Sequence, residues 1–121
     1  MKGFSFFLAV IGILIAAGCV HFNPVEPENG IIYREKGNID VTFDLNSRTI
    51  TTTNRNDLGA SVEVLRWNND VNDYLRIFYT GLGPYGKVTK EADFDYGDKI
   101  KIIFKIEGQE TPLYDFFEIK R

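Results

Sequence analysis

The sequence predicts an all-β protein, a β-sandwich of about seven short strands that follows an N-terminal signal helix. Three observations support this prediction. Apolar and polar residues alternate along several segments, as in strands with one buried face. Turn-forming residues recur about every 8–12 positions, which is typical of sandwiches and small barrels. No window beyond residue 18 has helical spacing of any length.

The cleanest strand is expected after the Tyr96-Gly97-Asp98 turn. In it Ile100, Ile102, Phe104 and Ile106 face inward, whereas Lys99, Lys101, Lys105 and Glu107 face outward. The other expected strands are residues 39–45, 48–53, 60–67, 74–79, 88–94 and 112–119. Asn46-Ser47 predicts a hairpin between the first two of these. The apolar phase slips between Val64 and Leu65, which indicates a bulge or burial on both faces.

Length and composition limit the function classes. The chain has 121 residues, which is enough for one domain, and its formal net charge is -3. A mildly acidic protein is a poor partner for nucleic acid, because phosphate binding needs a basic patch. The single cysteine excludes an intramolecular disulfide.

The N-terminus has the three-part layout of a secretory signal. Lys2 supplies the positive charge, residues 4–15 form an apolar stretch, and Ala16-Ala17-Gly18 are small enough for a peptidase cleft. Cys19 follows directly. We therefore divide the chain into a signal (1–18), a proline-containing tether (19–30) and a sandwich domain (31–121).

The run Ile15-Ala16-Ala17-Gly18-Cys19 resembles the lipobox of bacterial lipoprotein precursors. That family prefers Leu at the third place before the cysteine, where this chain has Ala16. The resemblance implies that Cys19 carries lipid and anchors the protein to a cell-envelope membrane on the extracytoplasmic side. Two alternatives remain. Ala16-Ala17-Gly18 also suits ordinary secretion. The other alternative is an uncleaved membrane anchor, although the uncharged run 3–20 is slightly shorter than the roughly 20 residues of a spanning helix.

A second resemblance concerns the domain itself. The stretch Tyr96-Gly97-Asp98-Lys99-Ile100-Lys101-Ile102 is similar to the turn and strand found late in immunoglobulin-like or fibronectin-type domains. This resemblance implies an immunoglobulin-like sandwich. It identifies no ligand.

The residues that could take part in catalysis or bind a metal do not predict an enzyme. His21 is the only histidine and lies in the tether, where a rigid catalytic site is not expected. Zinc needs several Cys or His ligands. Asp93, Asp95 and Asp98 are weak candidates for a cation, but their spacing does not match an EF-hand, and Asp and Gly are ordinary turn residues. The polar loop 68–73 has similar standing, because Asx-turns explain its composition. We predict no metal and no cofactor.

Aromatic side chains provide the best binding candidates, namely Tyr85, Tyr74 and Trp67. Exposed rings would form a protein or glycan contact surface, although we expect Trp67 and Phe78 to pack in the core. Tyr85 lies in the glycine-rich segment 81–86, whose turn is expected to direct the ring outward. The predicted role is a non-enzymatic binding or assembly module. An envelope inhibitor or exclusion factor is the alternative, and a small hydrolase is a third.

Overall fold

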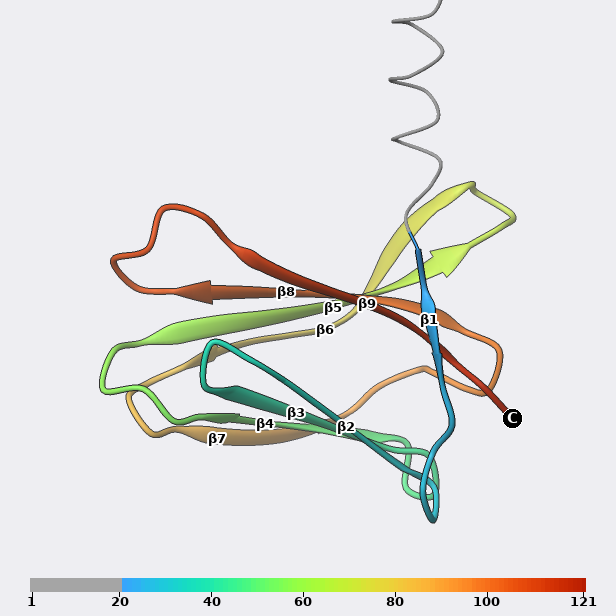
Figure 1. Ribbon diagram of the computed structural model, residues 1–121, viewed down its shortest axis with the longest axis horizontal. Coiled ribbons are helices and arrows are strands. Elements are labelled where there is room, and N and C mark those ends of the chain that lie inside the picture. Colours follow the sequence, from blue (N-terminus) through green and yellow to red (C-terminus); the bar gives the residue numbers. More distant parts are fainter. Residues whose placement is uncertain (1–20) are drawn as a thin grey trace, which may run out of the picture.

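Two β-sheets packed on each other make up residues 21–121, the part of the chain that the computed structural model describes (Figure 1). The strands are β1 (Asn23–Val25), β2 (Ile31–Lys36), β3 (Ile39–Asp44), β4 (Thr49–Asn54), β5 (Ala60–Asn68), β6 (Asp73–Leu82), β7 (Lys87–Glu91), β8 (Lys99–Ile106) and β9 (Leu113–Ile119). One sheet has the order β1-β9-β8-β5-β6, and the other has the order β2-β3-β4-β7. The all-β sandwich-like prediction is confirmed. The predicted signal helix and Cys19 lie outside the described residues.

The core is formed by alternate residues of both sheets, as the period of two requires. Phe43 of β3 lies edge-on to Phe94 and Phe117, with ring centroids 5.4 and 5.2 Å apart. In β8 the predicted orientation is confirmed, because Ile100, Ile102, Phe104 and Ile106 are buried whereas Lys99 and Lys105 are exposed.

A bulge lies opposite Val64 and Leu65, the place where the apolar phase of the sequence slips, but it belongs to β6 and not to β5. The β5–β6 register shifts between Val64 and Leu65: Val64 pairs with Phe78, but Leu65 pairs with Arg76. The extra residue is therefore Ile77 of β6, because the pairing of β5 with β8 is continuous. Bulges increase local twist. The far end of the β5–β6 hairpin, yellow-green in Figure 1, extends beyond the other strands.

Two strands were not expected from the sequence, and they raise the number in residues 21–121 to nine. β2 pairs with β3 through a turn at Gly37 and Asn38, whose φ angles are 57° and 59°. Two positive φ angles are the signature of a type I′ turn, which matches the twist of a hairpin.

The other additional strand, β1, lies within the segment expected to be a tether. Asn23 is the partner of Phe117 in a parallel pairing with β9, and the N–H of Lys120 donates to the carbonyl of Val25 at 2.9 Å. Phe22 lies edge-on to Phe116 at 5.8 Å between centroids. Pro24 is tolerated because β1 is an edge strand. Residues 23–25 therefore belong to the sheet and do not space the domain from its N-terminus.

Candidate functional site

The outward side chains of the four-stranded sheet form an ordinary water-facing surface. Cross-strand partners share a face, so the pairings of β2, β3, β4 and β7 define its members. We call this surface the acidic face; it comprises Ile31, Tyr33, Glu35, Asp40, Thr42, Asp44, Thr49, Thr51, Thr53, Lys87, Thr89 and Glu91. Threonines and carboxylates dominate it, as expected for the solvated side of an antiparallel sheet.

The outward side of the five-stranded sheet is different. We call it the aromatic face; it comprises Phe22, Glu63, Leu65, Trp67, Tyr74, Arg76, Tyr79, Lys99, Lys101, Ile103, Lys105, Tyr114, Phe116 and Glu118. Many of its outward-facing side chains are aromatic or aliphatic, whereas most of those on the acidic face are threonine or carboxylate. Tyr79 and Tyr114 are 47% and 42% exposed, so the surface is accessible in the described domain.

Lys101 lies at the centre of the aromatic face. It pairs with Leu65 on one side and with Phe116 on the other. Its ammonium nitrogen is 5.1 Å from the ring centroid of Tyr74, 5.3 Å from that of Tyr114 and 5.7 Å from that of Phe116. These are cation–π distances. The rings therefore hold a positive charge in a fixed place among apolar atoms.

Trp67 and Tyr74 form a pair at the projecting end of the hairpin. Their ring centroids are 5.1 Å apart with an interplanar angle of 78°. The indole Nε1–H donates to Oδ1 of Asn69 at 2.8 Å. Burial raises the pKa of the Tyr74 hydroxyl. The expectation that Trp67 packs in the core is wrong, because its place in β5 directs the ring to the outer face; Phe78, only 4% exposed, does lie in the core.

Tyr85 points outward, as its turn predicted. It is 69% exposed, has a φ of 55°, and its N–H donates to the carbonyl of Asn56 at 3.1 Å. It follows the end of β6, whereas Trp67 and Tyr74 lie seven pairs away at the other end of the hairpin. That separation is about 23 Å at 3.3 Å per residue. Trp67 and Tyr74 therefore belong to one surface, and Tyr85 belongs to another.

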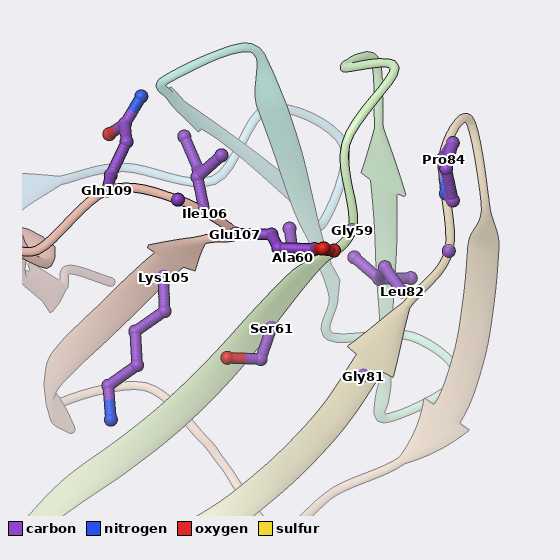
Figure 2. A pocket seen from close by; sticks show the side chains of 12 residues that line it. Gly59, Ala60, Ser61, Gly81, Leu82, Pro84, Lys105, Ile106, Glu107 and Gln109 are labelled. Carbon is purple, nitrogen blue, oxygen red and sulfur yellow. The ribbon is translucent and has the colours of Figure 1, made fainter.

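A shallow hollow lies near the Tyr85 end of the five-stranded sheet (Figure 2). Gly81 and Gly83 have no side chains to fill it, and a Cβ built at either position would meet no atom within 4 Å. Ser61, Lys105 and Glu107 line it, but Lys105 extends away from Glu107 in Figure 2. Ser61 and Lys105 are cross-strand partners, but no hydrogen bond among the described residues joins the Ser61 hydroxyl to Lys105 or Glu107.

The three aspartates named as cation candidates are engaged with the protein itself. Asp93 pairs with Arg66 at 3.1 Å, and Asp95 pairs with Arg48 at 3.0 Å. Asp98 accepts a hydrogen bond from the N–H of Asp95 at 2.7 Å. The hydrogen bond from Arg48 lowers the pKa of Asp95, whereas burial raises the pKa of Asp98. In residues 21–121 no group of three or more His, Cys, Asp or Glu side chains is placed to hold a metal ion.

Sequence reasoning identified Trp67 and Tyr74 but missed their neighbours on the aromatic face. Tyr114 and Phe116 lie in β9, whose two faces both carry apolar or aromatic side chains, so the sequence pattern does not show which residues point outward. That lack of alternation was the available signal, because a strand with one solvated face ordinarily alternates. Phe22 had no local signal, since it reaches the face only through the pairing of β1 with β9.

The chain matches no protein-family model, no curated protein and no solved structure. Within residues 21–121 there is no helix long and apolar enough to cross a membrane.

Proposed function

We propose that the chain is the precursor of a lipid-anchored cell-envelope protein, held by Cys19 on the extracytoplasmic side of a membrane. Its sandwich, of the immunoglobulin-like kind, is a non-enzymatic binding or assembly module. The aromatic face is its principal contact surface. Cys19 supplies the anchor, and Trp67 and Tyr74 are contact residues together with Tyr114 and Phe116.

The order of the strands supports the immunoglobulin-like assignment. In those domains the first strand of the C–C′ hairpin lies beside strand F, which in turn lies beside strand G. The order β6-β5-β8-β9 reproduces C′-C-F-G, with β5–β6 and β8–β9 as neighbouring pairs. The turn Tyr96-Gly97-Asp98 precedes β8, the strand that corresponds to F.

The contrast between the two outer faces carries the functional proposal. Both belong to one small domain, yet only one exposes a field of rings around a central ammonium group. Tyr and Trp are enriched in the centres of interfaces because they combine large apolar area with a polar tip. A role in contacting a partner explains why this outer face carries exposed aromatic rings and the acidic face carries mainly threonines and carboxylates.

Replacing Tyr114 with a photoreactive phenylalanine analogue tests the contact surface in living cells. The matched control is the same replacement at Tyr33, which is 59% exposed on the acidic face. Adducts with envelope components should form at position 114 and be sparse at position 33. Equal yields at the two positions would contradict the proposal.

The anchor has a separate test. Cys19→Ser should abolish incorporation of labelled palmitate and block cleavage by the lipoprotein peptidase, because the thiol is the lipid acceptor. A Ser variant that is processed at the same bond, together with a parent protein that carries no lipid, would identify ordinary secretion instead.

A further inference from the structure

We propose that the aromatic face binds the surface of the bilayer that holds the anchor, with anionic lipid headgroups against its lysines. This inference rests on the proposed lipid anchor and names the partner of the aromatic face.

The chain between the anchor and the aromatic face is very short. Only Val20 and His21 separate Cys19 from Phe22. Three residues span about 10 Å when fully extended. Phe22 lies against Phe116, and its ring centroid is 5.7 Å from the ammonium nitrogen of Lys99. A lipid on Cys19 therefore keeps this edge of the aromatic face close to the headgroups.

The side chains of the face suit the boundary between lipid and water. Trp67, Tyr74 and Tyr114 have apolar rings with polar tips, the type of residue that collects at membrane interfaces. Leu65 and Ile103 lie between them as half-buried aliphatic side chains. Lysines can place their methylene stems on apolar surface and keep the ammonium group at headgroup level.

Charge separates the two sides of the sandwich. The cations of the aromatic face are Arg76, Lys99, Lys101 and Lys105, and its carboxylates are Glu63 and Glu118. Glu63 is already paired with Arg76 at 2.6 Å. The acidic face carries the carboxylates Glu35, Asp40, Asp44 and Glu91 and the cation Lys87. Arg55 adds a second cation there, paired with Asp40 at 2.9 Å and with Glu35 at 3.4 Å, so carboxylates remain in excess. An anionic bilayer attracts the first side and repels the second, although the whole chain has a net charge of -3.

The single tryptophan of the chain makes the orientation measurable, because Trp67 lies on the aromatic face. The mature lipidated protein is reconstituted into vesicles of phosphatidylcholine and phosphatidylglycerol that contain brominated lipid. Bromine quenches only rings that reach the bilayer, so Trp67 emission should fall several-fold. The matched variant, Trp67→Phe with Tyr33→Trp, moves the only indole to the acidic face, and its emission should be unchanged.

Substitutions of the lysines on the aromatic face provide a second, independent test of binding to anionic lipid. One basic residue near an anionic surface shifts binding about fivefold. Lys99→Gln and Lys105→Gln should each reduce the ratio of docked to undocked domains by that factor, and vesicles of phosphatidylcholine alone should reduce it further. Lys87→Gln on the acidic face is the control and should leave the quenching unchanged.

Flotation of the same vesicles reports the anchor separately. Protein that floats while Trp67 stays unquenched overturns membrane docking and leaves the anchored binding module intact. Protein that carries no lipid by mass spectrometry and does not float overturns both. Shielding of Trp67 that requires an added envelope protein or glycan assigns the face to that macromolecule and overturns the bilayer proposal.

Discussion

Arg34 of β2 and Asp115 of β9 form a two-pronged ion pair that joins the two sheets. Nε of Arg34 donates to Oδ2 of Asp115 at 2.6 Å, and Nη2 donates to Oδ1 at 2.8 Å. The two side chains are only 23% and 13% exposed. The guanidinium also lies 5.0 Å from the ring centroid of Phe117. This pair closes the sandwich beside the core.

Breaking the Arg34–Asp115 pair should destabilise the domain. Asp115→Ala leaves a largely buried guanidinium without its partner, so we expect a loss of about 2–3 kcal/mol in the free energy of unfolding. Arg34→Ala should cost a similar amount. The double variant should cost little more than either single one, because both substitutions remove the same interaction. Urea unfolding measures all three, and losses that simply add would show that the pair contributes nothing as a unit.

Phe104 and Lys101 lie on opposite faces of β8 and should respond very differently to truncation. Phe104 is fully buried, so Phe104→Ala should cost about 3–5 kcal/mol through lost contacts and a cavity. Lys101→Ala removes only exposed or half-exposed cation–π contacts, which contribute about 0.5–1 kcal/mol. Equal losses in denaturant unfolding would contradict the orientation of β8.

Tyr74 predicts a loss of stability in alkaline solution. Its pKa is raised by burial from the ordinary value of 10.0, so the folded domain holds this proton more tightly than the unfolded chain. Stability should be complete below the ordinary pKa and should fall as pH rises through the raised one. Tyr74→Phe should reduce this dependence in unfolding experiments run at increasing pH. A Tyr74→Phe variant with the parental alkaline profile would remove Tyr74 as the cause.

Tyr85 lies on a different surface from the aromatic face, and it tests whether the loop after β6 also contacts a partner. Tyr85→Ala should melt at the parental temperature, because a ring that is 69% exposed contributes little packing, and should lose those crosslinks to envelope partners that form at this loop. Tyr85→Gly should lose the same crosslinks and gain up to about 1 kcal/mol, since the φ of 55° favours glycine. A Tyr85→Ala variant that unfolds several degrees earlier but still captures its partners would show that the ring only packs.

The alternation of apolar and polar residues along the sequence predicts individual strands and their buried faces. The inward face of β8 follows from spacing alone, whereas the phase slip at Val64 and Leu65 reflects the apolar outer face of β5, because the bulge itself lies at Ile77 of β6. The β2–β3 hairpin also has a local signal, because Gly37-Asn38 is a two-residue sequence of the kind that forms type I′ turns. The position of β1 had none, since its partner β9 lies at the other end of the chain.

The candidate site shows the same limit. Trp67 and Tyr74 are only seven residues apart, and their hairpin placed them together. Lys101 and Phe116 join them through the neighbouring strands β8 and β9, so their contact depends on strand order. The separation of Tyr85 likewise follows from the length of β6, which places it at the opposite end.

The parallel strand β1 has a consequence for any shortened form of the protein. β9 would be the edge of its sheet if Asn23–Val25 did not cover it. An uncovered edge presents unpaired backbone groups to other chains and promotes aggregation. Proteolysis after Val25 would therefore separate the domain from the proposed lipid anchor and make it prone to self-association in the same step. Residues 23–25 thus act as a protective cover, and the solubility of the domain depends on keeping them.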